Sequence, residues 1–304
     1  MGSADDLTLA YQPWLNRCTF DPAPKAVRCG VSGGADSLAL LVLAIAHGLD
    51  VTAVHIDHGL RPETEAWLVA RAAQRFGAQF ESLSVEIEPG PNLEERARTA
   101  RLRGLGPDAL TGHTADDQAE TVLLQLMWGA GPAGSAGMEP GPSKPLLGLR
   151  RADTEAVCQT AGLEWFIDPT NADARFRRNR VRHELIPLMN QIADRDVVPL
   201  LNRSATVSRS TIAALEQLLP DGDPTDTRWL GTLPPEVARL VVRRWLKDLT
   251  GRPLSADATE RAMRVVGHQI KATELEGGHR LQRSDGRLSV HGSTGENASE
   301  ITGR

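Results

Sequence analysis

The stretch Cys29-Gly30-Val31-Ser32-Gly33-Gly34-Ala35-Asp36-Ser37 connects a segment typical of a buried strand, residues 26–31, to an apolar segment of helical length, residues 37–47. Its two adjacent glycines allow backbone N–H groups to approach an anion closely, and Ser32 and Ser37 add hydroxyl donors. The following helix directs the positive end of its dipole to the same place. The stretch therefore predicts a site for an anion the size of pyrophosphate, although a Gly-Gly connection is also a common simple turn.

Two better-known glycine-rich loops are excluded. The stretch is not a Walker A loop, because the spacing G-x-x-x-x-G-K-[ST] and its lysine are absent. Residues 129–134 match G-x-G-x-x-G, but they follow a predicted helix, whereas the dinucleotide fingerprint needs a strand before it. We assign residues 129–144, which are rich in Gly and Pro, to a loop.

Segments typical of strands and of helices alternate around this loop. Strands are expected at 26–31, 51–56, 80–87 and 108–111, and helices at 37–47, 63–76, 94–105 and 115–128. This alternation predicts an α/β fold with a parallel sheet that helices cover on both faces. Such sheets bind ligands at the carboxyl edge of their strands, where the glycine-rich loop would lie.

The alternation ends near residue 190. Helical stripes and one expected hairpin at 277–290 follow: Leu201, Ala205, Ile212, Leu215 and Leu219 form one stripe, and Val237, Leu240, Val241, Trp245 and Leu249 form another. We therefore expect a first domain over residues 1–190, a smaller and mainly helical second domain over 195–292, and a polar tail over 293–304.

Composition narrows the protein class. The 304 residues are 40% hydrophobic and 24% charged, which is ordinary for a globular protein. The longest apolar run, residues 38–46, is nine residues long, whereas a membrane-spanning helix needs about 20. No signal peptide is recognisable, and Cys18, Cys29 and Cys158 are too far apart for a disulfide framework or a Cys-x-x-Cys motif. We expect a cytoplasmic protein with reduced thiols and no membrane partner.

Three further strings contain residues suited to chemistry. The first follows the second predicted strand, the second opens a helix, and the third leads into a basic segment: His55-Ile56-Asp57-His58-Gly59-Leu60-Arg61, Thr111-Gly112-His113-Thr114-Ala115-Asp116-Asp117-Gln118-Ala119-Glu120-Thr121, and Asp168-Pro169-Thr170-Asn171 before Arg178-Asn179-Arg180-Val181-Arg182-His183-Glu184-Leu185.

Taken in this order, the glycine-rich loop and the three strings resemble the motifs of the tRNA(Ile)-lysidine synthetases, a family of PP-loop ATP pyrophosphatases. The resemblance covers about residues 25–190 and continues more weakly over 195–292. It implies that ATP adenylates the C2 oxygen of the wobble cytidine in a tRNA(Ile) with a CAU anticodon. The amine of free L-lysine then attacks C2, and the products are lysidine, AMP and pyrophosphate. ATP is thus the implied co-substrate and Mg²⁺ the implied cofactor.

The resemblance also implies roles for individual residues. Nucleotide binding falls to Ser32, Gly33, Gly34, Ala35, Asp36, Ser37, His55 and Asp57, and catalytic roles fall to Asp36, His113, Asp117, Glu120 and Arg101. Asp36 would hold Mg²⁺ or orient the phosphates, or else simply begin a helix. For His55, Asp57 and His58 we favour contact with the adenosine over a metal site. We assign no cluster of metal ligands.

The lysine substrate needs acidic partners. Its ammonium has an ordinary pKa of about 10.4, so a site must hold the cation and later remove a proton. The spacing of His113, Asp117 and Glu120 places them on one helix face if the helix begins near His113. The resemblance implies that Asp117 and Glu120 bind lysine, with His113 near the nucleotide. The alternative is an ordinary helix start with Asp116 and Glu120 on the surface.

The chain carries a net charge of −5, so any contact with nucleic acid needs a local basic patch. Five arginines against one acid, Asp173, supply such a patch: Arg175, Arg177, Arg178, Arg180 and Arg182. Arginine suits phosphate contacts, and we expect Arg178, Arg180 and Arg182 to contact tRNA. The alternative is a solvated helix start held by salt bridges.

The chain departs from the family in one segment. The helix that follows the string at 92–101 is about two turns shorter than usual over 98–112, and Arg101 matches a family arginine that contacts the tRNA or the nucleotide. The alternatives to lysidine formation are a PP-loop tRNA thiolase, which normally needs a cysteine pair, an amide ligase of the same superfamily, and a non-catalytic RNA-binding relative.

Overall fold

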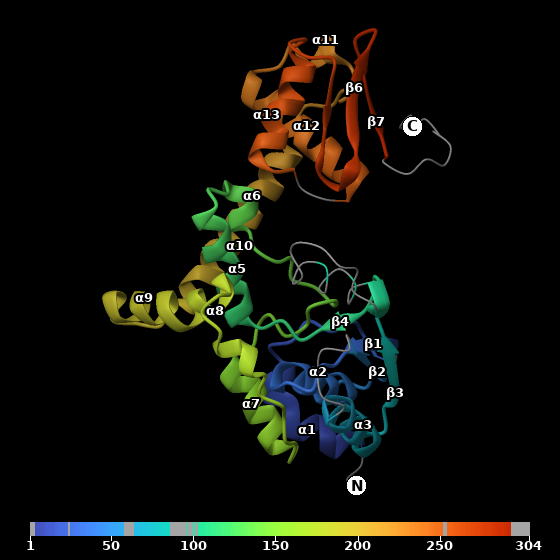
Figure 1. Cartoon of the computed structure of the whole chain (residues 1–304), viewed down its shortest axis with the longest axis vertical. Coiled ribbons are helices and arrows are strands. Elements are labelled where there is room, and N and C mark those ends of the chain that lie inside the picture. Colours follow the sequence, from blue (N-terminus) through green and yellow to red (C-terminus); the bar gives the residue numbers. More distant parts are fainter. Residues whose placement is uncertain are drawn as a thin grey trace. The chain divides into compact units, whose positions relative to one another are not determined.

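A computed structural model of the chain describes residues 4–23, 25–57, 64–85, 96, 100, 103–251 and 254–292 (Figure 1). The chain divides into two compact units, Met1–Gln125 with Ala136–Ala205 and Leu126–Ser135 with Thr206–Arg304. These units are structural, and the domain limits at residues 190 and 195 stay a prediction. None of the helices among the described residues is long and apolar enough to cross a membrane.

The first unit is built on a parallel sheet, as the alternation of segments predicted. Its strand order is β3-β2-β1-β4, with β1 at Ala26–Gly30, β2 at Asp50–Asp57, β3 at Gln79–Ser84 and β4 at Leu110–Thr111. In the middle of the sheet, Cys29 of β1 lies opposite Ala53 of β2 and Leu110 of β4. The carboxyl ends of β1 and β4 therefore meet beside the glycine-rich loop.

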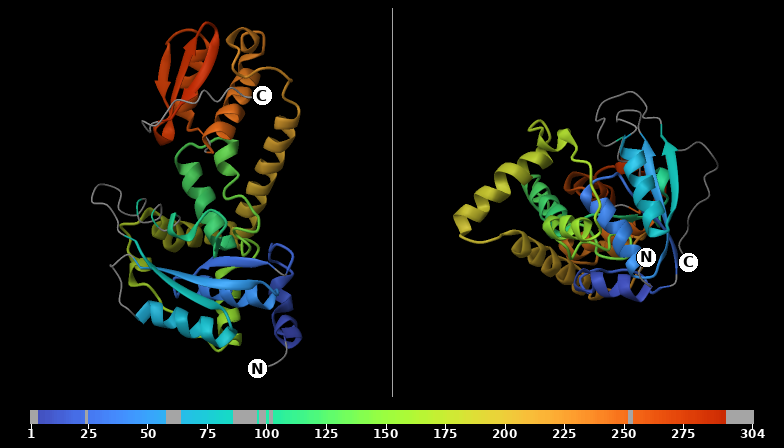
Figure 2. Two further views of the ribbon diagram at one scale, coloured as in Figure 1. Left: turned by 90° about the vertical axis from the view of Figure 1, so that its right-hand side faces the viewer. Right: turned by 90° about the horizontal axis from the view of Figure 1, so that it is seen from below.

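Helix α2, Ala35–Ala46, forms the centre of the main core. Its apolar residues surround the helix on all sides, and those from Leu38 to Ala44 are completely buried. The helix contacts β1, β2 and β4 as well as α1 (Ala4–Leu15), α3 (Thr64–Phe76) and α7 (Arg151–Thr160). Figure 2 shows α3 beside β2 and β3. Gly48, with a φ of +92°, follows the end of the helix, in the left-handed conformation that often terminates helices.

The opposite face of the sheet has a smaller core of its own. Val54 of β2 packs there against Leu105 and Ala109, from the segment that precedes β4. Val51 and Ala53 of the same strand belong to the main core instead, as the alternation of side chains along a strand requires. Both faces of the sheet are therefore covered, while the helix predicted at 94–105 lies largely outside the described residues.

A third group of helices carries the chemistry-bearing strings. It comprises α5 (Ala115–Met127), the short α8 (Arg177–Arg180), a π-helix (Val181–Leu185), α9 (Ile186–Ala193) and α10 (Val198–Gln217). Ala119 and Leu123 of α5 pack against Val181 and Val198. The helix predicted from the first apolar stripe is confirmed as α10, but its Leu215 is 44% exposed.

The second unit pairs helices with an antiparallel sheet. The second apolar stripe is confirmed as α12, Pro235–Thr250, and the hairpin as β6, Arg280–Ser284, with β7, Arg287–His291. Strand β5 (Ala272–Glu274) completes the sheet in the order β5-β6-β7. Helices α11 (Thr227–Leu230) and α13 (Ala256–Val266) were not expected, and α6 (Pro132–Ser135) lies in the loop at 129–144. The buried side chains of α12, α13 and this sheet form one core.

Candidate active site

The glycine-rich loop is held by its own hydroxyl groups. The backbone N–H of Ser32 donates to Ser37 Oγ at 3.1 Å, and Ser37 Oγ in turn donates to the carbonyl oxygen of Gly34 at 2.9 Å. Gly33 has a φ of +86°, a backbone conformation that side chains disfavour. The Ser37 hydroxyl thus shapes the loop, and the residues from Ser32 to Gly34 lead directly into the N-terminus of α2.

A second glycine brings the end of β4 against this loop. A Cβ atom at Gly112 would lie only 2.7 Å from the carbonyl oxygen of Asp36, so a larger residue would push the two segments apart. This close approach places the start of α5 next to the start of α2. The carboxylates predicted from two separate strings therefore meet at one edge of the sheet.

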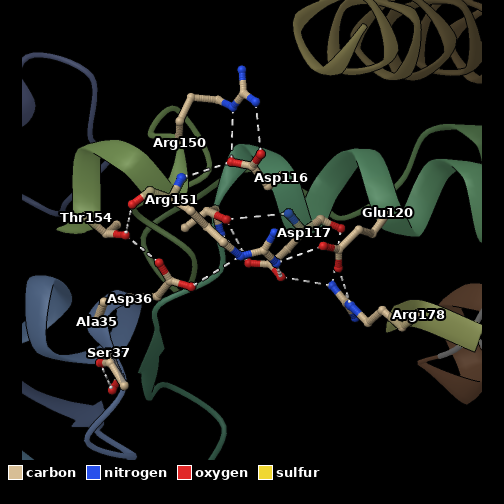
Figure 3. Close-up of polar contacts among 12 residues, drawn as sticks. Ala35, Asp36, Ser37, Asp116, Asp117, Glu120, Arg150, Arg151, Thr154 and Arg178 are labelled. Carbon is tan, nitrogen blue, oxygen red and sulfur yellow. Dashed lines mark hydrogen bonds and ion pairs between the residues drawn. The ribbon is translucent and has the colours of Figure 1, made fainter. Parts of the chain in front are cut away.

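Asp36 points from the first turn of α2 towards α7. Its Oδ1 accepts a hydrogen bond from the buried Thr154 hydroxyl, and its Oδ2 lies 3.8 Å from Arg151 Nε (Figure 3). Burial raises the pKa of Asp36 to about 6, and the negative charge of Asp117 acts in the same direction, against the opposing effects of Thr154 and Arg151. The raised pKa means that the nearby donor and arginines only partly offset the effect of burial on this carboxylate.

Asp117 both begins α5 and holds two arginines. Its Oδ2 accepts hydrogen bonds from the backbone N–H and the hydroxyl of Thr114, at 2.8 and 2.9 Å, in the manner of a helix cap. Its Oδ1 lies 2.8 Å from Arg151 Nη2 and 3.2 Å from Arg178 Nη2. Burial favours a higher pKa, but Arg151 and Arg178 outweigh it and hold the pKa of Asp117 below its ordinary value.

Glu120 lies one turn further along α5 and is only 1% exposed. Its Oε2 accepts a hydrogen bond from Arg178 Nε at 2.7 Å. Its Oε1 is 2.8 Å from Arg151 Nη2 but receives no hydrogen bond of good geometry from the described residues. Asp117 and Glu120 share one face of α5 as predicted, whereas His113 precedes the helix and is not on that face. The alternative of a surface Glu120 is wrong.

The arginine-rich segment divides between this cluster and the surface. Arg178 reaches Asp117 and Glu120, whereas Arg180 is 61% exposed and pairs with Glu184 on the next turn. Arg182 is half-buried, and burial followed by the nearby charge of Arg151 lowers its pKa. The alternative of a salt-bridged helix start thus describes Arg180, while contacts of these arginines with tRNA stay a prediction.

Comparison with known proteins identifies the family. A curated tRNA(Ile)-lysidine synthase from Nocardia farcinica is 38% identical over 287 residues, which are 88% of this chain and 89% of the relative. The chain belongs to the tRNA(Ile)-lysidine synthase family. A relative of the same name from Mycobacterium leprae is 37% identical over 86% of this chain and 89% of its own length. Another from Salinispora tropica is 38% identical over 89% of this chain and 91% of its own length.

Two family models divide the chain in the same order. Residues 11–189 match a PP-loop domain, and residues 228–289 match a TilS substrate binding domain. The carboxylate cluster lies wholly within the first match. It therefore belongs to the PP-loop domain of this chain. The glycine-rich loop lies within the match to the PP-loop domain, and its role as a phosphate site stays a prediction.

Asp36 fits the Mg²⁺ that the lysidine synthase resemblance implies. Among the described residues no three His, Cys, Asp or Glu side chains are grouped to hold a metal ion unaided. Mg²⁺ usually binds through one or two carboxylates together with phosphates and water, so a single carboxylate beside a phosphate loop suffices. A buried carboxylate with a raised pKa and a second carboxylate nearby is one that a divalent cation would stabilise.

The other predicted residues lie near the ends of β2 and β4 or outside the described residues. His55 is buried at the end of β2 with its Nδ1 3.1 Å from the carbonyl oxygen of Val31, and Asp57 ends the same strand. His113 precedes α5, and its Nδ1 lies 2.9 Å from Thr111 Oγ1. Arg101 and His58 lie outside the described residues, as does part of the shortened segment at 98–112.

The sequence analysis missed the residues of α7 that complete the cluster. Arg151 touches the carboxylates of Asp117 and Glu120 and approaches that of Asp36, and Arg150 pairs with Asp116 at 3.0 Å. The signal was the adjacent pair of arginines at a helix start, where the helix dipole disfavours cations. Such a pair needs carboxylate partners elsewhere in the fold, and these are on α5 and α2.

Proposed function

We propose that this chain joins lysine to C2 of the wobble cytidine of a CAU-anticodon tRNA(Ile) through an adenylated tRNA, with release of AMP and pyrophosphate. The single observation that carries the proposal is the meeting of Asp36, Asp117 and Glu120 around Arg151. The phosphate loop and the acidic pocket, which serve the two halves of the reaction, are thereby adjacent. Family membership supports the same reaction.

The nucleotide half of the reaction would use the loop and Asp36. Backbone N–H groups of the loop and the α2 N-terminus would hold the phosphates of ATP, and His55 and Asp57 would lie towards the nucleoside at the end of β2. Asp36 would hold Mg²⁺, which when bound offsets the negative charge of the phosphates. Thr154 keeps the Asp36 carboxylate oriented by its hydrogen bond.

The lysine half would use α5. Asp117 and Glu120 would bind the ammonium. Glu120 Oε1 is an available acceptor, because none of the described residues gives it a hydrogen bond of good geometry. The two carboxylates favour the charged ammonium, so the neutral nucleophile forms only when a proton leaves. We propose that Glu120 Oε1 takes the proton as the amine attacks C2, with His113 near the nucleotide.

The tRNA would meet Arg178, Arg180 and Arg182 and the second unit, which contains the match to a substrate binding domain. The basic segment provides the local patch that a chain of net charge −5 needs for nucleic acid. We propose that the protein acts in the cytoplasm, where ATP, lysine and tRNA occur together.

The cysteines give no support to the thiolase alternative. Cys18, Cys29 and Cys158 are free thiols, and burial raises the pKa of each to about 12. The thiolate is the reactive form and the metal ligand, so three thiols with pKa values this high are poorly suited to sulfur transfer or to holding a cluster.

The test is incorporation of labelled lysine into unmodified CAU-anticodon tRNA(Ile) with ATP and Mg²⁺. Initiator methionine tRNA and a reaction without ATP are the controls. We expect ATP-dependent labelling of the isoleucine tRNA alone, and Asp117→Asn should raise the lysine concentration required without affecting ATP binding. No labelling, with ATP and tRNA both bound, would contradict the proposal and favour the thiolase or a non-catalytic relative.

A further inference from the structure

Three oxygen atoms converge on the guanidinium of Arg178. Its Nε donates to Glu120 Oε2 at 2.7 Å, and its Nη2 lies 3.2 Å from Asp117 Oδ1 and 3.3 Å from the carbonyl oxygen of Asp117. All three oxygens belong to the first turns of α5, whereas Arg178 comes from α8, far later in the chain. Figure 3 shows the Arg178 side chain reaching this end of the carboxylate cluster.

The three oxygens match the needs of a lysine ammonium. An ammonium has three N–H donors and no acceptor, and two carboxylate oxygens with one carbonyl oxygen satisfy all three. Resting on the proposed function, we infer that these oxygens are the ammonium site and that Arg178 occupies it until tRNA binds. Arg178 therefore holds the place of the substrate cation.

The guanidinium of Arg178 and the ammonium of lysine exclude each other because both are positively charged. Asp36, Asp117 and Glu120 carry three negative charges, and the guanidinium groups of Arg151 and Arg178 pair with them directly, with the charge of Arg182 nearby. An ammonium added to the full set would have to compete with Arg178 for its acceptors and would lie close to another cation. Once Arg178 has left, one monovalent cation restores the same balance.

Of the two arginines in the cluster, Arg178 and Arg151, Arg178 is the one that can leave. Its side chain is 33% exposed, whereas that of Arg151 is 17% exposed and lies among all three carboxylates. Helix α8 has only four residues and continues into the π-helix Val181–Leu185. Such π-helical turns are rare and frequently occur at functional sites.

The partner that would draw Arg178 away is the phosphate backbone of tRNA. A guanidinium binds phosphate by paired, charge-assisted hydrogen bonds, so moving from two carboxylates to a phosphate keeps its charge compensated. Binding of tRNA would then release the three oxygens from Arg178 for lysine, while Asp117 Oδ1 keeps its hydrogen bond from Arg151. Because such coupling is reciprocal, lysine would also strengthen tRNA binding, and each ligand would bind the protein better in the presence of the other.

The experiment measures binding of labelled lysine by equilibrium dialysis to the full-length protein, without ATP, with and without saturating tRNA(Ile). Arg178→Gln is compared with the wild type, and Arg28→Gln is the matched control, because Arg28 of β1 is 41% exposed and pairs with Glu81, outside both the carboxylate cluster and the basic segment. We expect Arg178→Gln without tRNA to bind lysine about tenfold more tightly than the wild type, within the usual range of such couplings. We also expect tRNA to strengthen lysine binding to the wild type and to Arg28→Gln, but not to Arg178→Gln.

Equal or weaker lysine binding by a folded Arg178→Gln protein, or no detectable binding to it, would overturn the inference. Thermal unfolding and ATP binding check that the variant is folded, and Arg178→Met serves as a second neutral variant. If neither variant folds, a wild-type lysine affinity that tRNA leaves unchanged overturns the inference. Absence of lysine incorporation by the wild type would instead be a failure of the proposed function, so the two outcomes are distinguishable.

Discussion

Replacing Glu120 with Gln removes one negative charge from the carboxylate cluster while keeping the size of the side chain. Breaking a buried ion pair costs about 3–5 kcal/mol, and a hydrogen bond to a charged group contributes about 1.5–3 kcal/mol. Arg178 is one-third exposed and can turn to water, and Arg151 keeps Asp117 at 2.8 Å. We therefore expect the free energy of unfolding to fall by about 2 kcal/mol, below the range for a fully buried pair.

The same substitution should act strongly on lysine. Glu120 supplies one of the three oxygens around Arg178 and also the acceptor that lacks a hydrogen bond of good geometry among the described residues. Loss of a charged acceptor for an ammonium costs about 3 kcal/mol, which corresponds to a rise in the lysine KM of about 100-fold. Urea unfolding gives the stability change, and steady-state lysine incorporation at saturating ATP and tRNA gives the KM.

Glu155→Gln is the matched control for this experiment. Glu155 is exposed on α7, and neutralising it should change the free energy of unfolding by less than about 0.5 kcal/mol and leave the lysine KM unchanged. A Glu120→Gln protein with wild-type stability and a wild-type lysine KM would refute the reasoning, because a buried carboxylate between two arginines could not then be contributing to either property.

The other predictions concern Asp36, its partner and the arginine segment. Burial raises the pKa of Asp36 to about 6, so its folded form binds a proton more tightly than the unfolded chain does, and its contribution to stability falls as pH rises from about 4 to about 6. Asp36→Asn should therefore be more stable than the wild type at pH 7 by about 2 kcal/mol, with no gain at pH 3. Thermal unfolding with EDTA measures both stabilities. Equal stabilities at pH 7 would contradict this prediction. Thr154→Val should weaken Mg²⁺-dependent ATP binding and lower stability by about 1 kcal/mol, whereas Thr154→Ser should retain both; equal effects of the two variants would remove the hydroxyl from the explanation. Arg180→Gln with Arg182→Gln should weaken tRNA binding and flatten its dependence on log salt by roughly 0.7 for each phosphate that the variant no longer neutralises, and an unaltered slope would leave these arginines with a structural role only.

Local sequence patterns predicted the features that depend on neighbouring residues. The alternation of strands and helices indicated the parallel sheet, and the spacing of Asp117 and Glu120 placed both carboxylates on one face of α5. Helix α13 also had a local signal that was overlooked: Ser255 caps it by accepting a hydrogen bond from the backbone N–H of Ala258, and Ala262 and Val265 continue its buried face.

Pairings between distant segments could not be predicted in this way. The hydrogen bond between Thr154 and Asp36 joins residues 118 positions apart, and no periodicity within either segment indicates it. The arginine segment shows the same difficulty, because Arg178 and Arg180 are close neighbours in sequence. Only the packing of α8 against α5 directs one to a buried carboxylate and leaves the other to an exposed pair.

The complete burial of α2 has a consequence for the energetics of nucleotide binding. Because residues Leu38 to Ala44 have no exposed surface, the phosphate loop at the head of this helix is ordered by the folding of the core itself. The conformational entropy of the loop is then lost once, during folding, and not again with each ATP molecule. Association of ATP with this loop should resemble the docking of two rigid bodies, with a small change in heat capacity and a rate set by encounter rather than by loop closure.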